Sequence, residues 1–214
     1  MQLLMQVVLL SAFCTMVLGL PALPHSEQPW AQFCCPLIQP ILPPLLGTGC
    51  PPIVSRAQWG ARPPRRQVRL TTPVPNVIIH HTAGNRCSSQ ASCSLQVKGI
   101  QNFHMDKRRY DDIAYNFLIG EDGRVYEGRG WTTRGGHTRN WNSKSLGFSF
   151  LGTFTNSLPN AAALNAAKHL IRCAVSRGFL SRTYRLKGHR NVGQTSCPGN
   201  ALYQEIKKWP RFQA

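Results

Sequence analysis

Val77-Ile78-Ile79-His80-His81 is the stretch of sequence that decides the fold. It is apolar and β-branched up to its two histidines, and polar and apolar side chains do not alternate along it. Such a run predicts a strand that is buried on both faces, which is typical of a sheet covered by helices. The strand therefore belongs to the interior of a domain and carries a histidine at its end.

Helix and strand patterns interleave along the rest of this domain. Apolar residues recur every three or four positions in three predicted helices, at residues 94–107, 161–177 and 200–209. Ser94 is expected to cap the first helix and Gly178 to close the second. Further strands are expected at residues 114–120, 125–129, 145–152 and 184–188, with Asp122-Gly123 as a hairpin turn. The predicted fold class is mixed α/β: a central, mostly parallel sheet with one hairpin, covered by three main helices.

The first 52 residues differ from the domain in composition. Residues 3–20 are mostly apolar and precede small residues, which predicts a secretory signal peptide at residues 1–19 with cleavage near Gly19 or Ala22. No Lys or Arg precedes the run, so an uncleaved anchor of barely sufficient length is the alternative. Residues 20–52 are rich in proline and lack periodicity, so we expect an extended arm before a domain at residues 53–214.

The cysteines agree with export to an oxidising compartment. Of the 8 cysteines, Cys14 would leave with the signal peptide, and the seven that remain are Cys34, Cys35, Cys50, Cys87, Cys93, Cys173 and Cys197. Most should form disulfides in such a compartment, and the odd number leaves one thiol for another role or another chain.

The charge bears on the partners of the protein and not on its fold. The 25 Lys and Arg against 8 Asp and Glu give a formal charge of +17 at pH 7, which fits nucleic acid, an anionic membrane or an anionic cell wall. No nucleic-acid-binding motif is present, and no segment after residue 20 is apolar enough to insert stably into a membrane. A basic secreted protein without a specific polyanionic partner is the alternative.

Three residues form a candidate metal site. His80 ends the buried strand, His189 follows the strand at 184–188, and Cys197 lies eight residues further on. Two imidazoles and a thiolate suit one Zn²⁺ ion with an open position for water, whose pKa zinc lowers to about 7. Spacing alone leaves two alternatives open, because a buried strand histidine is often a core residue and Cys197 is a candidate for a disulfide.

Four motifs resemble those of the peptidoglycan recognition proteins, animal relatives of the phage and bacterial N-acetylmuramoyl-L-alanine amidases. The motifs are His80-His81-Thr82, Tyr115-Asn116-Phe117, Glu127-Gly128-Arg129-Gly130-Trp131 and Lys187-Gly188-His189-Arg190. They belong to longer matching segments, and the resemblance extends from about residue 53 to the C-terminus.

The resemblance implies roles for individual residues. His80, His189 and Cys197 match the zinc ligands of the catalytic members, whereas binding-only members typically lack one of them, often the cysteine. Tyr115 resembles the catalytic tyrosine of the family, with a core strand residue as the alternative, and Thr195 stands where a second oxyanion donor is expected. The implied reaction is hydrolysis of the amide bond between the lactyl group of N-acetylmuramic acid and L-alanine of the stem peptide.

The resemblance further implies a substrate groove and two disulfides. The positions that match the groove are His104, Arg109, Tyr110, Trp131, His137 and Asn142. A structural role is the alternative for His104, Trp131, His137 and Asn142. Arg109-Tyr110 replaces the residue pairs with which the family usually distinguishes stem peptides, and Arg109 is a candidate partner for a stem carboxylate. The implied disulfides are Cys87–Cys93 and Cys50–Cys173, which leaves Cys34 and Cys35 without an assigned partner.

The function implied by the resemblance is that of a secreted zinc amidase of innate immunity. Its expected partners are bacterial peptidoglycan and muropeptides, together with anionic cell-wall polymers attracted by the net charge. Two other functions are kept as alternatives: a non-catalytic protein that recognises or kills bacteria by binding peptidoglycan, and a basic antimicrobial protein that acts on membranes.

Overall fold

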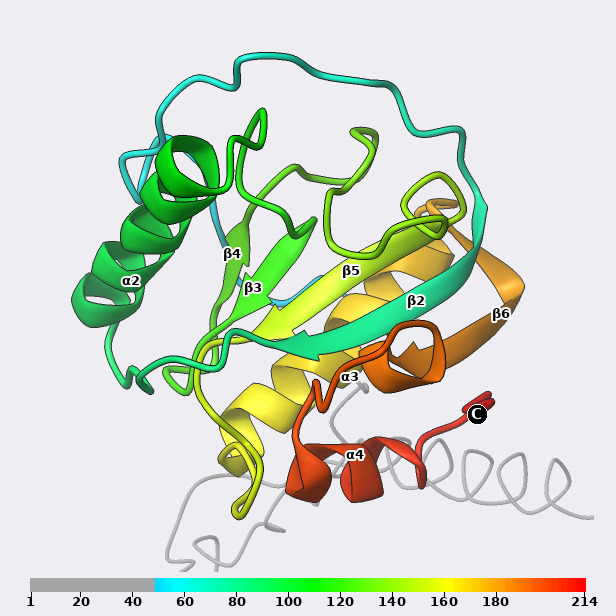
Figure 1. Ribbon diagram of the computed structural model, residues 1–214. Coiled ribbons are helices and arrows are strands. Elements are labelled where there is room, and N and C mark those ends of the chain that lie inside the picture. Colours follow the sequence, from blue (N-terminus) through cyan, green and yellow to red (C-terminus); the bar gives the residue numbers. More distant parts are fainter. Residues whose placement is uncertain (1–48) are drawn as a thin grey trace, which may run out of the picture. The chain divides into compact units, whose positions relative to one another are not determined.

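The computed structural model of the protein describes residues 49–214 (Figure 1). The predicted signal peptide at residues 1–19, most of the predicted arm at residues 20–52, and Cys14, Cys34 and Cys35 lie outside the described residues. Within the described part, no helix combines the length and the apolar composition that crossing a membrane requires. The boundaries of the signal peptide and of the arm therefore stay predictions.

A six-stranded sheet forms the centre of the fold. Its strands are β1 (Ile53–Val54), β2 (Val74–His81), β3 (Phe117–Ile119), β4 (Val125–Glu127), β5 (Ser145–Phe150) and β6 (Leu180–Gly188). They lie in the order β1-β4-β3-β5-β2-β6. The β3–β4 hairpin is antiparallel and the other four pairs are parallel. The predicted fold class, with its mostly parallel sheet and its hairpin, is confirmed.

Helices cover the two faces of this sheet. They are α2 (Gln90–Asn102), which continues as the π-helical turn η1 (Phe103–Lys107), then α3 (Ala161–Ser176), the short turn η2 (His189–Asn191) and α4 (Asn200–Ile206). Figure 1 shows α3 crossing behind the sheet and α2 standing on the other side of it. The packing agrees, because α3 shares one apolar cluster with Leu146 and Phe148 of β5, and α2 shares the other with Leu118 and Tyr126.

The start of the first helix was predicted wrongly. Ser89, and not Ser94, caps α2: its hydroxyl accepts a hydrogen bond from the Ser92 amide, and the Ser92 hydroxyl accepts one from the Ser89 amide. The buried face of the helix already begins at Cys93, which is 0% exposed. Cys93 was interpreted only as a disulfide partner, so its place on the buried face of the first helical turn was missed.

Other boundaries shifted by smaller amounts. Helix α3 ends one residue earlier than predicted, with Gly178 following at φ +74°. Helix α4 ends at Ile206, although Trp209 is still buried as predicted. Strand β6 begins at Leu180 rather than 184, because its exposed polar half lies at the edge of the sheet, where no apolar pattern is required.

Both predicted disulfides are confirmed. Cys87 bonds to Cys93 across the loop that precedes α2, and Cys50 bonds to Cys173 of α3. The second bond joins residues 123 positions apart, so it ties the beginning of the described chain to the helix behind the sheet.

Candidate functional site

The three predicted metal ligands meet at one end of the sheet. His80 lies near the carboxyl end of β2, and His189 follows the carboxyl end of the neighbouring strand β6. These strands are parallel and Ile79 is in register with Gly188, so the two histidines leave adjacent strands side by side. Cys197, in the loop before α4, completes the cluster, and the ligand atoms of the three residues all lie within 4.8 Å of one another.

The donor set of this cluster fits zinc. Cys197 forms no disulfide with any cysteine of residues 49–214, is buried, and places its Sγ 3.8 Å from Nδ1 of His80. A tetrahedral zinc site with two imidazoles and one thiolate separates its ligand atoms by roughly 3.3–3.6 Å, so small side-chain movements would close the cluster around an ion. Both alternatives from the sequence, a cystine at Cys197 and an ordinary core histidine at His80, are thereby disfavoured.

Burial controls the protonation of these ligands. It raises the pKa of Cys197 to about 11, although a hydrogen bond from the His81 amide opposes this. Burial lowers the pKa of His80 well below its ordinary value, and it also lowers the pKa of His189. Both imidazoles are therefore neutral at physiological pH, as metal ligands must be, while a metal would have to displace the thiol proton.

His137 holds His80 in position. Its Nδ1 lies 3.0 Å from Nε2 of His80, so Nδ1 of His80, which faces Cys197, remains available to a metal. Burial lowers the pKa of His137 to about 3, so the contact joins two neutral rings. Such a partner fixes the tautomer and orientation of a ligating imidazole. The sequence predicted substrate binding for His137 and missed this positioning role.

Two glycines, one on β5 and one in the loop before His137, make room for that ring. A Cβ atom at Gly147 of β5 would overlap with the His137 imidazole, and one at Gly135 would lie 2.5 Å from its Cδ2. Glycine is thus required at these two positions because the imidazole ring approaches the backbone closely, and not because the backbone adopts an unusual angle.

Tyr115 and Thr195 line the metal cavity, which has a volume of about 270 Å³. The Tyr115 ring centroid lies 5.4 Å from that of His80. Burial, followed by the nearby Cys197, raises the pKa of Tyr115 far above its ordinary value, so its hydroxyl remains a hydrogen-bond donor. The neighbouring Ser149 acts on that pKa in the opposite direction, although its hydroxyl lies outside hydrogen-bonding geometry to every described residue. The Thr195 hydroxyl accepts a bond from the Cys197 amide at 3.1 Å.

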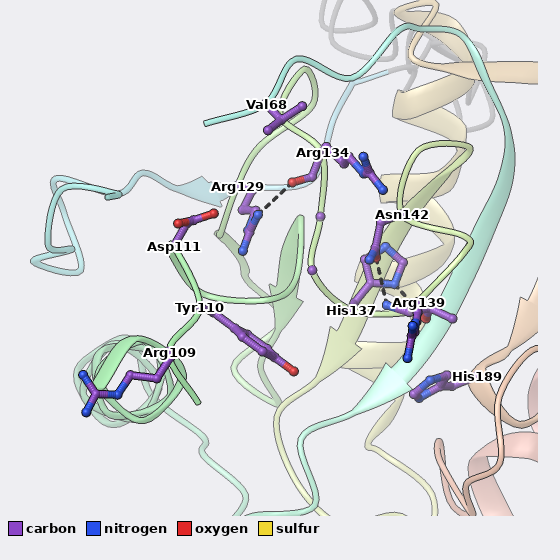
Figure 2. Close-up of a pocket in the computed structure, with 13 residues that line it drawn as sticks. Val68, Arg109, Tyr110, Asp111, Arg129, Arg134, His137, Arg139, Asn142 and His189 are labelled. Carbon is purple, nitrogen blue, oxygen red and sulfur yellow. Dashed lines mark hydrogen bonds between the residues drawn. The ribbon is translucent and has the colours of Figure 1, made fainter. Parts of the chain in front are cut away.

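A larger cavity of about 510 Å³ adjoins the metal cavity, since Tyr110, His137 and His189 line both (Figure 2). Arg109 and Asn142 line the larger cavity. Figure 2 shows the Tyr110 ring projecting into this space, whereas the Arg109 guanidinium extends away from it.

His104 lines the metal cavity. Its Nδ1 accepts a hydrogen bond from the Ala114 amide at 3.1 Å. Burial, followed by the charge of Arg129, lowers its pKa to about 4, so this imidazole is neutral at physiological pH.

Trp131 lies elsewhere. Its ring packs 4.2 Å from Phe117 and stacks on Phe179 at 5.0 Å, measured between ring centroids. It lines neither of the two cavities, and its contacts are those of a core side chain, which was the alternative considered for it.

Arginines of the larger cavity were missed. Arg129, Arg134 and Arg139 all line it, against one acidic residue, Asp111. Arg129 donates hydrogen bonds to the carbonyl oxygens of Ile113 and Arg134 and thereby links these two backbone segments. The high net charge was the one signal of this cluster in the sequence, and it does not locate individual residues.

Comparison with known proteins identifies the family. The model of the N-acetylmuramoyl-L-alanine amidase family matches residues 70–200. Peptidoglycan-recognition protein 1 of Holotrichia diomphalia is 48% identical over 163 residues, which cover 76% of this chain and 83% of that protein. Peptidoglycan recognition protein 1 of Bos taurus is 47% identical over 174 residues, covering 79% and 92%.

Solved structures agree with this match. Wild-type Drosophila PGRP-LB superposes with a TM-score of 0.74 at 41% identity and covers 75% of this chain and 95% of its own. Human PGRP-IBETAC in complex with glycosamyl muramyl pentapeptide superposes with a TM-score of 0.75 at 47% identity, covering 77% and 100%. With its fold, its histidine–cysteine cluster and these relatives taken together, the chain belongs to the peptidoglycan recognition proteins of the N-acetylmuramoyl-L-alanine amidase family.

Proposed function

We propose that this protein is a secreted, zinc-dependent N-acetylmuramoyl-L-alanine amidase that binds peptidoglycan and separates its stem peptides from the glycan. The observation that carries the proposal is the convergence of His80, His189 and Cys197 within 4.8 Å. A binding protein has no need of a buried, unpaired thiol between two neutral imidazoles. The two disulfides of the described residues support an extracellular location.

His80, His189 and Cys197 would hold one Zn²⁺ ion. When bound, zinc supplies a Lewis acid for the scissile carbonyl and lowers the pKa of a water molecule to about 7. His137 would keep the His80 ring in the orientation that directs Nδ1 toward the ion. Among the described residues no Asp or Glu lines this cavity, so the site offers no carboxylate as a general base.

Tyr115 and Thr195 would act on the reacting carbonyl. Because the Tyr115 phenol stays protonated, it is a donor for the oxygen on which negative charge develops. The Thr195 hydroxyl accepts from the Cys197 amide through its oxygen, which leaves its own hydrogen free to donate to the same oxyanion.

The adjoining cavity would bind the stem peptide. Its arginines complement the carboxylates of such a peptide, and the human relative is described in complex with a muramyl pentapeptide. Tyr110 projects into the cavity and Arg109 extends from its rim (Figure 2). We therefore expect Tyr110→Ala to weaken muropeptide binding more than Arg109→Ala, for both diaminopimelate and lysine stems. Equal affinity of Tyr110→Ala and wild type would remove this assignment.

One digestion tests the proposed activity. Purified protein is incubated with peptidoglycan, with and without a chelator, and released stem peptides are identified by mass spectrometry. We expect stem peptides to appear, to vanish with chelator and to return with added Zn²⁺. Cys197→Ser should abolish release and Tyr115→Phe should reduce the rate about 100-fold, while both variants still bind peptidoglycan.

The same experiment separates the alternative function. Peptidoglycan that sediments with the wild-type protein but releases no stem peptide with any added metal would identify a non-catalytic recognition protein. Release that is unaffected by chelator and by Cys197→Ser would contradict the metal site itself.

A further inference from the structure

A third cavity is separate from the metal cavity and from the larger cavity beside it. It has a volume of about 430 Å³ and shares no lining residue with the metal cavity or with the larger cavity. Its walls come from α3, from β6 and from the segment that follows α4, namely Lys168, Ile171, Arg172, Tyr184, Leu186, Lys208, Trp209 and Pro210. Figure 1 shows β6 at the edge of the sheet, with α3 behind the sheet.

The inner walls of this cavity are apolar. Ile171, Leu186 and Trp209 are buried in the protein core, and Tyr184 is half-buried beside them. A volume of this size is within the range of sites that bind small molecules. The apolar floor favours a hydrocarbon ligand, because each methylene moved out of water strengthens binding by about fourfold.

The rim of the cavity is basic. Lys168, Arg172 and Lys208 line it, and Arg211 adds a further charge over the Tyr184 ring. Glu205 is the nearby acid, and its ion pairs with the two lysines measure 3.8 and 3.5 Å.

Glu205 fixes the geometry of this rim. Its carboxylate accepts a hydrogen bond from Nε1 of Trp209 at 3.0 Å, and the Lys168 ammonium lies 5.2 Å from the centre of the Trp209 ring. The acid therefore holds the indole and both lysines together. Arg172 is exposed and forms no hydrogen bond or ion pair within residues 49–214, so its guanidinium is free to bind an anion.

We propose that this cavity binds an acyl chain that carries a phosphate headgroup, as presented by a glycerophospholipid. The chain lies against Ile171, Leu186 and Trp209, and Arg172 pairs with the phosphate. A guanidinium matches phosphate geometry with two parallel hydrogen bonds. Because the cavity shares no lining residue with the two cavities of the functional site, a bound lipid leaves the metal centre open while it retains the protein at an anionic membrane.

Titration calorimetry with dodecyl phosphate, kept below its critical micelle concentration, tests the site on the full secreted chain. We expect one molecule to bind per chain. Octyl phosphate should bind roughly 250-fold more weakly, because four methylenes at about fourfold each are lost. Inorganic phosphate and dodecyl maltoside, which lack the chain and the charge respectively, should also bind more weakly than dodecyl phosphate.

Two variants with a matched control locate the site. Arg172→Glu should weaken dodecyl phosphate binding at least about tenfold, and Arg172→Lys should restore most of it. Arg66→Glu makes the same charge change at another exposed arginine that does not line the cavity, and it should bind like wild type. Both glutamate variants should keep wild-type release of stem peptides, so failure here is distinguishable from failure of the amidase proposal.

Three results would each overturn the inference. Equal binding by Arg172→Glu and wild type would place the ligand elsewhere. An equal loss in Arg66→Glu would reduce the effect to net charge. Affinity that is independent of chain length would show that the apolar walls take no part.

Discussion

Strand β5 presents two different surfaces from six consecutive residues. Leu146, Phe148 and Phe150 point to the face that packs on α3 and are 0% exposed. The alternate residues, Ser145, Gly147 and Ser149, are also buried but lie on the opposite face, where they are small or polar and Gly147 adjoins the His137 ring. One face is filled to stabilise the fold, and the other is kept shallow so that imidazole rings fit above it.

The same division extends to β2. Val77 and Ile79 belong to the apolar cluster on the α3 side, while His80 projects to the other face and meets His137. Stability and chemistry are therefore carried by alternate residues of the same strands. Substitutions one position apart should separate the two properties, and the following predictions test this.

The largest expected effect is on the apolar face. Phe148→Ala removes a fully buried ring that contacts Phe117 and should lower the free energy of unfolding by about 3–5 kcal/mol. Urea unfolding followed by circular dichroism measures this. The folded variant should still release stem peptides at a rate within a few-fold of wild type; a stable but inactive variant would contradict the division.

Gly147→Ala tests the neighbouring position on the site face. The new methyl group overlaps with His137, so we expect a loss of about 1–3 kcal/mol from overpacking. Release of stem peptides should fall about 10–100-fold, because His80 loses the ring that orients it. Gly99→Ala on α2 is the matched control, since its methyl group meets no atom within 4 Å and should slightly stabilise the helix.

His104, which lines the metal cavity, should make the stability of the protein depend on pH. Its folded pKa of about 4 lies below the ordinary value of 6.5, so the unfolded chain takes up a proton that the folded protein excludes. Stability should fall as pH decreases from about 6.5 and level off below about 4. Between pH 7 and pH 5, His104→Gln should lose about 2 kcal/mol less than wild type, measured by urea unfolding at both values. Equal losses of stability in His104→Gln and wild type between pH 7 and pH 5 would refute the role of His104.

The smallest effect is expected at Ser149. Its buried hydroxyl has no hydrogen-bond partner among the described residues, so Ser149→Ala should change stability by no more than about 0.5 kcal/mol. Ser145 is equally buried, but its hydroxyl donates to the Trp141 carbonyl at 2.8 Å. Ser145→Ala should therefore cost about 1–2 kcal/mol, and a reversed order in thermal unfolding would show that Ser149 is paired.

Local patterns predicted the elements well where burial imposes a period. The residues of α3 recur on one face, and its predicted limits differ from the structure by one residue. The pattern failed at Ala114, Tyr115 and Asn116, which were assigned to a strand although β3 begins at Phe117. There the Asn116 side chain bonds to the carbonyl oxygens of Gly130 and Thr133, and no local pattern encodes contacts with a distant loop.

The sequence by itself determined the α/β class and the candidate metal ligands, and its resemblance to a known family implied the two disulfides, because hydrophobic period and distinctive motifs are local properties of the chain. Only the tertiary structure decided that His137 supports His80, that Trp131 packs in the core, and that a separate cavity with a basic rim lies beside β6. These depend on which side chains meet after the strands pair in register, and that pairing joins residues separated by a hundred positions or more.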